Sequence, residues 1–281
     1  MAGSFYGWYV KCQSDAQTLA VIPAVHRASG EKTASIQVIT NDGAWTADYP
    51  GGAFRRRGRR LELGGSSFGE EGVRLSVSAP GLEAEGELVF GPLSPLRYDI
   101  MGPFAAVPFL ECRHRVWSMR HTVRGEVRVN GRPYAFRDAW GYWEGDEGRS
   151  FPREYAWTQS VLPRGSLMLA AADIPMPGFR FTGVIGAVLW AGKEYRIATY
   201  LGARAARIGD GALRIVQGNL EFEARLLEKS ARPLRAPAMG DMVRTIHESA
   251  ACRARYRLCR RGETIFELET DLASFEYEYP R

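Results

Sequence analysis

The sequence predicts an all-β protein, and three observations support this. Apolar and polar residues alternate with period two through much of the chain, the pattern of strands that bury one face. Turn signals rich in Gly and Asn separate the alternating runs, and the 281 residues include 31 Gly and 15 Pro. No long stretch shows the periodicity of an amphipathic helix. The best helix candidate, residues 242–255, fits alternation about as well.

The clearest predicted strand runs from Trp117 to Val129, with His121 on its apolar, inward face. Asn130-Gly131 follows, and this pair favours a tight hairpin because both residues accept positive φ. We therefore expect residues 132–137 to return as the second strand. The same pattern predicts hairpins over residues 36–49, 184–200 and 255–268. About 15 to 20 short strands result, too many for one eight-stranded barrel.

We expect a domain boundary close to the turn after this strand. The chain then divides into an N-terminal β domain, residues 1–133, and a C-terminal β domain, residues 134–281. The Pro- and Gly-rich runs 93–108 and 162–179 are interpreted as loops, where functional sites often lie.

Composition excludes several classes of protein. Hydrophobic residues make up 45% and charged residues 25%, a globular balance, and the net charge is +5. No run approaches the ~18 apolar residues of a spanning helix, and the N-terminus does not resemble a signal peptide. We therefore expect a cytoplasmic protein. The four Cys and four His form no CxxC, HxH or HExxH motif, so we expect no metal site.

An arginine run at residues 55–60 is the strongest local concentration of charge. Such a run binds phosphates or anionic head groups, so we expect peripheral membrane contact there. No aromatic residues are interleaved with it, which argues against nucleic-acid binding. The alternative is a solvated hairpin tip. The arginines are Arg55, Arg56, Arg57, Arg59 and Arg60.

Residues 138–159 concentrate acidic and aromatic side chains. Aromatic rings around an acid exclude water and raise its pKa, which produces a proton donor, and ring faces stabilise cations. If 155–159 is a strand, Tyr155, Trp157 and Gln159 share one face. The alternative is a core strand flanked by a salt bridge to Arg149. His121 has a similar alternative, since an inward His is more often a hydrogen-bonded core residue than a catalyst.

Several tracts resemble the tocopherol cyclase-like family, in order over most of the chain. The most specific is Asp-Glu-Gly-Arg-Ser-Phe-Pro at 146–152, within the tract 141–152. The others are 9–23, 102–114, 118–121, 155–159, 181–183 and 195–200. The chain has Glu147 and Arg120 where the family pattern has Trp and an acid, so we expect a product other than tocopherol.

The resemblance implies two side-by-side lipocalin-like antiparallel β-barrel or sandwich domains, distantly similar to carotenoid hydratase-type proteins. It also implies an intramolecular lyase of the isomerase class that protonates the alkene of a prenylated quinol, whose phenol oxygen then captures the cation. The resemblance implies that this reaction needs no cofactor and no metal. Asp146 is the expected proton donor, Glu144 the alternative, and His121 or His114 holds or deprotonates the phenol. The expected substrate-binding residues are Trp117, Tyr142, Trp143, Arg149, Tyr155, Trp157 and Gln159.

Three other functions stay open. Water instead of phenol could capture the cation, which makes an isoprenoid hydratase. The chain could instead be a non-catalytic carrier of a hydrophobic lipid or quinone. The third possibility is a structural protein, in which side chains fill both barrels and the surface binds a partner.

Overall fold

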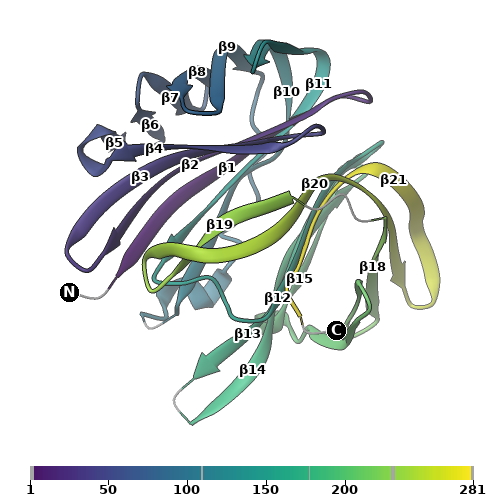
Figure 1. The fold of residues 1–281 in the computed structure, drawn as a ribbon. Helices are drawn as coiled ribbons and strands as arrows, with labels where there is room; N and C mark the ends of the chain where they lie inside the picture. The colour runs from purple at the N-terminus through teal and green to yellow at the C-terminus, as the bar shows by residue number, and fades with distance from the viewer. Residues whose placement is uncertain (1–2, 109, 177, 229–231, 280–281) are drawn as a thin grey trace. The chain divides into compact units, whose positions relative to one another are not determined.

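The structure is a computed structural model that describes residues 3–108, 110–176, 178–228 and 232–279 (Figure 1). Nearly all of the described chain is β-strand. The described helical segments are three short 3-10 turns: η1 (Gly51–Ala53), η2 (Gly102–Ala106) and η3 (Thr199–Leu201). The prediction of an all-β chain with two large antiparallel sheets is confirmed.

The first sheet has eleven strands in the order β4-β3-β2-β1-β11-β10-β9-β8-β7-β6-β5. Most neighbours are joined by hairpins, and the pairing of β1 with β11 brings together segments that are far apart in the sequence. The strands are β1 (Ser4–Gln13), β2 (Thr18–Ala28), β3 (Glu31–Thr40), β4 (Ala44–Pro50), β5 (Phe54–Arg57), β6 (Arg60–Leu63), β7 (Ser66–Gly69), β8 (Gly72–Ala79), β9 (Leu82–Phe90), β10 (Cys112–Val129) and β11 (Arg132–Gly148).

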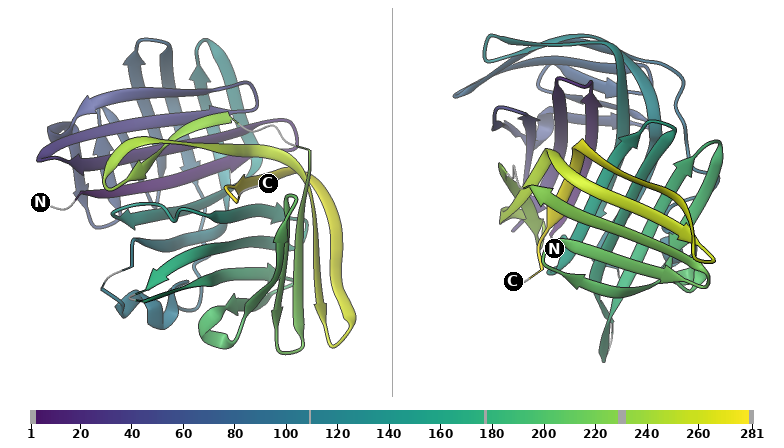
Figure 2. Two further views of the ribbon diagram at one scale, coloured as in Figure 1. Left: turned by 60° about the horizontal axis from the view of Figure 1, so that its bottom comes forward. Right: turned by 90° about the vertical axis from the view of Figure 1, so that its right-hand side faces the viewer.

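The second sheet has ten strands, with β19 paired to β20 beside the path β15-β14-β13-β12-β21-β20-β18-β17-β16. Its strands run from teal through green to yellow in Figure 2. They are β12 (Tyr155–Leu162), β13 (Gly165–Met176), β14 (Phe179–Trp190), β15 (Lys193–Ala198), β16 (Arg204–Gly209), β17 (Ala212–Gln217), β18 (Leu220–Glu228), β19 (Arg232–Ala238), β20 (Asp241–Arg260) and β21 (Glu263–Tyr277).

The chain forms two compact units, each with its own hydrophobic core. The first unit comprises the residues up to Pro95 with Glu111–Phe151 and Leu234–Thr245, and the second comprises Leu96–Leu110, Pro152–Pro233 and the residues from Ile246 onward. The turn beside the expected boundary at residue 133 joins two strands of the first unit, so the observed division differs from 1–133 and 134–281.

The predicted hairpins are present, and two local predictions are wrong. Asn130 (φ 49°) and Gly131 (φ 81°) make the predicted turn between β10 and β11. Residues 242–255, the best helix candidate, lie in β20, because pairing with β18 and β21 satisfies their backbone. Most of the expected loop 162–179 is strand β13, in which Pro175 occupies a paired position opposite Arg180.

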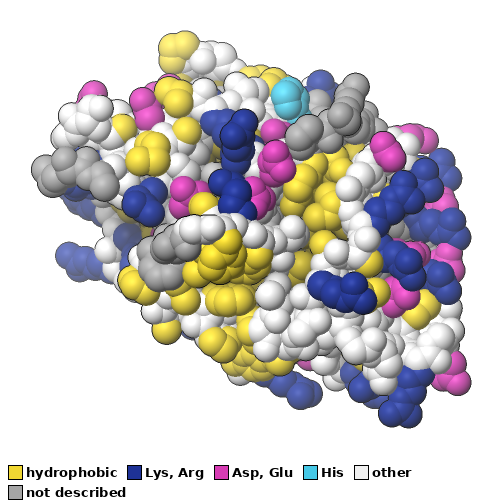
Figure 3. Space-filling model, turned by 90° about the horizontal axis from the view of Figure 1, so that it is seen from below, with side chains coloured by type: hydrophobic (Ala, Val, Ile, Leu, Met, Phe, Trp, Pro, Cys, Tyr) yellow, Lys and Arg dark blue, Asp and Glu magenta, His cyan; other side chains and the backbone are white. Residues whose placement is uncertain are grey.

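Basic and acidic side chains lie next to each other on the solvent-facing surface of the second sheet. Arg255 pairs with Glu267, Arg253 Nη2 lies 2.9 Å from Glu269 Oε2, and Arg214 Nε lies 2.7 Å from Glu221 Oε1. Such interleaving is visible at the right-hand edge of the face in Figure 3. Much of the arginine charge of this sheet is therefore balanced locally.

Candidate proton-transfer site

The alternation of β11 sorts residues 142–147 onto two faces of the first sheet. Tyr142, Glu144 and Asp146 lie on one face, whereas Trp143 lies on the other and enters the core of the first unit. In this region β11 is flanked by β1 and β10, and Asp146 is opposite Gly7 on β1 and His114 on β10. The strand pairing therefore brings a histidine beside the two acids.

His114 lies between both carboxylates. Its Nδ1 is 2.9 Å from Asp146 Oδ1, and its Nε2 is 2.9 Å from Glu144 Oε2. The Nδ1 contact has hydrogen-bond geometry, whereas at Nε2 the N–H does not point straight at the oxygen, so that contact is an ion pair. The histidine side chain is 10% exposed. Each ring nitrogen of His114 therefore lies 2.9 Å from a carboxylate oxygen.

This arrangement favours the imidazolium form of His114. Burial alone lowers the pKa of His114, because desolvation penalises the charged ring. The carboxylates of Glu144 and Asp146 outweigh burial and raise the pKa of His114 well above its usual value of 6.5. At neutral pH the site thus holds a proton on a buried ring between two acids.

Two more side chains complete the cluster. The Tyr142 hydroxyl donates a hydrogen bond to Glu144 Oε2, and Cys112 Sγ lies 3.5 Å from Asp146 Oδ1. Burial raises the pKa of both Tyr142 and Cys112 well above the usual range, so both remain neutral donors. Sequence reasoning missed Cys112, although it precedes His114 by two residues and shares its face of β10. Asp146 is 22% exposed and Glu144 5%, so Asp146 is the more accessible acid.

The same three side chains could hold a metal ion. One nitrogen of His114 and one oxygen each of Glu144 and Asp146 lie within 4.8 Å of one another. This mixed nitrogen and oxygen set suits several divalent cations. A metal would have to replace the proton on His114, so proton and metal compete for this site.

Two of the aromatic residues expected around the acids lie on the opposite face of the sheet. Trp143 stacks on Trp117, with ring centroids 5.0 Å apart, and Trp8 packs edge-on against Trp143 at 4.9 Å. Gly145 makes room for this cluster, because a Cβ there would lie 2.6 Å from the Trp117 ring. Of the predicted aromatic residues, Tyr142 is the one that the structure shows bonded to these acids.

His121 is buried on the Trp143 face and lies apart from the His114 cluster. Its Nδ1 is 3.0 Å from Ser118 Oγ, and its ring packs against Phe90 at 4.4 Å. Burial lowers the pKa of His121 to about 4, so the ring is neutral at pH 7. The inward orientation predicted from the sequence agrees with this placement. A direct role for His121 at the acids stays a prediction.

Tyr155, Trp157 and Gln159 belong to β12 in the second unit, and all three side chains are buried. The Tyr155 hydroxyl donates a hydrogen bond to Glu276 Oε2 on β21. Sequence reasoning missed Glu276, which lies 121 positions away along the chain. This Tyr–Glu pair resembles the Tyr142–Glu144 pair of the first unit. A role for these residues in substrate binding stays a prediction.

Arg149, expected near Asp146, is an exposed residue held by its main chain. Its N–H donates to Glu111 O at 2.7 Å, and its carbonyl accepts a bond from Gly240 N–H at 2.6 Å. The charged partner that the structure shows at Asp146 is His114. Unlike an arginine, His114 can give up its proton to the neighbouring acid.

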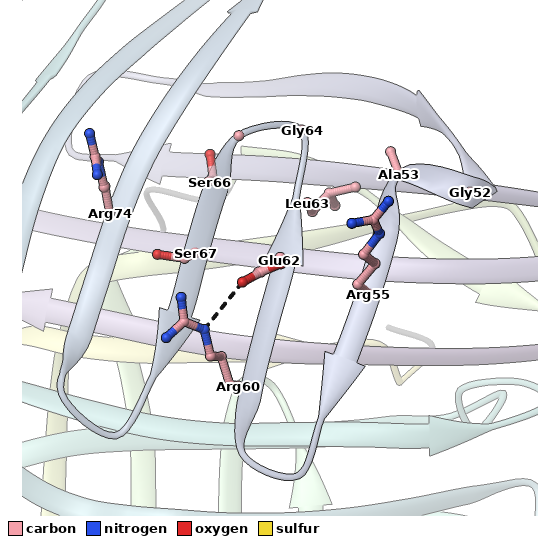
Figure 4. Close-up of a pocket in the computed structure, with 11 residues that line it drawn as sticks. Gly52, Ala53, Arg55, Arg60, Glu62, Leu63, Gly64, Ser66, Ser67 and Arg74 are labelled. Atoms are coloured by element: carbon pink, nitrogen blue, oxygen red, sulfur yellow. Dashed lines mark hydrogen bonds and ion pairs between the residues drawn. The ribbon is translucent and has the colours of Figure 1, made fainter.

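The arginine run lies on the hairpin of β5 and β6. Arg56 stacks on the Tyr6 ring at 4.3 Å, Arg59 pairs with Glu70, and Arg60 Nε lies 3.2 Å from Glu62 Oε1. Arg55 and Arg60 line a pocket of about 500 Å³ together with Arg74 on β8 (Figure 4). Membrane contact through this hairpin stays a prediction.

No helix among the described residues is both long and apolar enough to cross a membrane.

No protein-family model and no curated protein sequence matches the chain. Solved structures with a similar fold include kievitone hydratase from Nectria haematococca, with a TM-score of 0.58 and 9% identity over 98% of this chain and 89% of that one. CghA bound to Sch210972 gives a TM-score of 0.60 and 11% identity over 98% and 88%.

A protein named AttH from Nitrosomonas europaea gives a TM-score of 0.57 and 12% identity over 100% of this chain and 94% of that one. At such low identities the likeness establishes the fold alone.

Proposed function

We propose that this chain catalyses the addition of an O–H group across the alkene of a hydrophobic, isoprenoid-type substrate. The observation that carries the proposal is the buried imidazolium of His114, held 2.9 Å from both Glu144 and Asp146. A proton stored between two acids can move to either, and perturbed titratable groups of this kind cluster at catalytic sites.

The reaction needs one proton to be delivered and one to be recovered. The proton on His114 Nδ1 moves to Asp146 Oδ1, and the neutral acid adds it to an alkene carbon. The tertiary carbocation that forms is captured by an oxygen nucleophile, whose own proton returns to the cluster. The Glu144 carboxylate stabilises the developing positive charge, and this electrostatic stabilisation is strongest where water is excluded.

The nucleophile decides the product. Capture by a phenol of the same molecule closes a ring and yields an isomer, which is the reaction implied by the resemblance to the tocopherol cyclase-like family. Capture by water yields an alcohol, and the solved structures with a similar fold include one named as a hydratase. We propose cyclisation of a prenylated quinol first and hydration second, since both share the protonation step.

A panel of prenylated quinols tests this proposal, with products separated by mass. An isomer of the substrate indicates cyclisation, and a product heavier by one water indicates hydration. Asp146→Asn is expected to lower turnover by about 10²- to 10⁴-fold while leaving substrate affinity nearly unchanged. Asp138→Asn, an exposed acid on the same strand, is the control and should retain wild-type turnover.

Two other outcomes would redirect the assignment. If Glu144→Gln abolishes turnover while Asp146→Asn retains it, then Glu144 is the donor. If the wild-type chain binds the quinols without converting any of them, the carrier function is supported and catalysis is rejected.

A further inference from the structure

A second charged pocket lies in the second unit, where the β14–β15, β17–β18 and β20–β21 turns approach one another. Its volume is about 400 Å³, and it is lined by four basic side chains: Arg97, Lys193, Arg196 and Arg260. Among the described residues that line it, Glu194 is the one acid. The pocket therefore has a large excess of positive charge.

Arg196 forms the inner wall of this pocket and is 8% exposed. Its Nη2 donates to Tyr98 O at 2.9 Å and lies 3.0 Å from Glu194 Oε1, and its Nη1 donates to Asp99 O at 3.3 Å. Its Nε has no hydrogen-bond partner among the described atoms. A buried guanidinium donor without an acceptor is costly, so this N–H gains from an added oxygen acceptor.

The other three cations are exposed at the mouth of the pocket. Arg97, Lys193 and Arg260 form no ion pair with any residue that the structure describes. In this respect they differ from the arginines on β17 and β20 that form ion pairs with glutamates. Glu194 is already engaged, because it binds Arg196 and accepts a hydrogen bond from the Arg97 main-chain N–H at 3.2 Å.

The pocket is built by side-chain bonds between β15 and β17. Gln217 Oε1 accepts a bond from Ala198 N–H at 2.9 Å, and Gln217 Nε2 donates to Arg196 O at 3.0 Å. These bonds hold the Arg196 backbone, while Tyr98 and Asp99 hold its guanidinium. The inner donor is thus preorganised, which lowers the entropic cost of binding a ligand.

We propose that this pocket binds a phosphate group, either free or as a monoester. A phosphate oxygen accepts the Arg196 Nε–H, and Arg97, Lys193 and Arg260 surround the remaining oxygens. Three unpaired cations favour a doubly charged anion over a carboxylate. The arginine pocket of the first unit lacks such a buried donor, because Arg55, Arg60 and Arg74 are all exposed and Arg60 is paired with Glu62.

Calorimetric titration with inorganic phosphate, at constant ionic strength set by chloride, tests the proposal. Phosphate is expected to bind more tightly than acetate, and Lys193→Gln or Arg260→Gln should each weaken it about five- to tenfold. Arg74→Gln, which removes the same charge from the other pocket, is the matched control and should leave affinity unchanged. A second titration with glycerol phosphate shows whether the esterified form binds more tightly than free phosphate.

Nuclear magnetic resonance of the arginine side chains locates the ligand. The Arg196 Nε–H resonance is expected to shift as phosphate is added. The proposal is overturned if phosphate binds no better than chloride or acetate, or if Arg74→Gln weakens binding as much as Arg260→Gln. It is independent of the proton-transfer site, since none of these residues belongs to the His114 cluster.

Discussion

The Nδ1 atom of His114 lies 2.9 Å from Oδ1 of Asp146, in a direct pairing of β10 with β11. This contact couples the most accessible acid of the cluster to a ring that also faces Glu144. The ring therefore lies within 2.9 Å of a carboxylate oxygen of each acid.

Removing the imidazolium is expected to change how stability depends on pH. Because the pKa of His114 in the folded state is raised above 6.5, its stabilising contribution is complete below that pH and is lost as pH rises through the folded-state pKa. His114→Gln should lower the free energy of unfolding by about 3 kcal/mol near pH 6, because it leaves the two carboxylates without the cation between them. The difference from wild type should shrink at higher pH.

Urea unfolding at several pH values measures this effect. His247→Gln is the control, because the His247 side chain is 62% exposed and its contact with Glu278, at 3.9 Å, is a surface ion pair that contributes little to stability. A difference between His114→Gln and wild type that grows with rising pH would contradict an imidazolium at this position.

Zinc is expected to inhibit turnover by taking the place of the His114 proton. Because metal and proton compete for the ring, inhibition should strengthen as pH rises. Zinc affinity, measured by competition with a chromogenic chelator, should fall in Glu144→Gln and in Asp146→Asn. Asp138→Asn, which removes the same charge as Asp146→Asn, is the control and should retain wild-type zinc affinity. Inhibition that does not depend on pH would place zinc elsewhere.

Adding a methyl group at Gly145 is expected to disturb the tryptophan cluster. In Gly145→Ala the new Cβ would lie 2.6 Å from both the Trp117 ring and Gly7 O, which should cost about 2 kcal/mol of stability. Tryptophan fluorescence and thermal unfolding report the change. In Gly209→Ala the Cβ meets no atom within 4 Å, so this strand glycine is the control. Equal stability of the two variants would show that the cluster adapts freely.

The arginine hairpin is expected to bind membranes only through charge. Sedimentation with vesicles should show binding that requires anionic lipid and weakens with added salt. Arg55→Gln combined with Arg57→Gln should reduce binding by about thirtyfold, since each basic residue near the surface contributes about 1 kcal/mol. The charge-matched control removes Arg253 and Arg255, which are paired with glutamates. Binding to neutral vesicles would refute the prediction.

Local sequence determined the strands, the turns and the face on which each side chain lies. Asn130-Gly131 forms the predicted hairpin turn because its backbone preference is intrinsic. The alternation of residues 142–146 separates the acids from Trp143 without reference to the rest of the chain. The helix candidate at 242–255 failed because its apolar pattern fits both periods, and long-range pairing in the sheet decided between them.

Tertiary structure alone decided which side chains meet. Period two assigns a face to each residue, but it does not specify the strand or the residue that lies opposite. His114 reaches Asp146 through the register of β10 with β11, which contains irregularities between Val116 and His121. Cys112 enters the cluster through the same register, and Tyr155 meets Glu276 through the pairing of distant strands. Sheet register is set by burial and backbone pairing across the whole unit. The candidate acids could therefore be predicted from local sequence, but the histidine that lies between them could not.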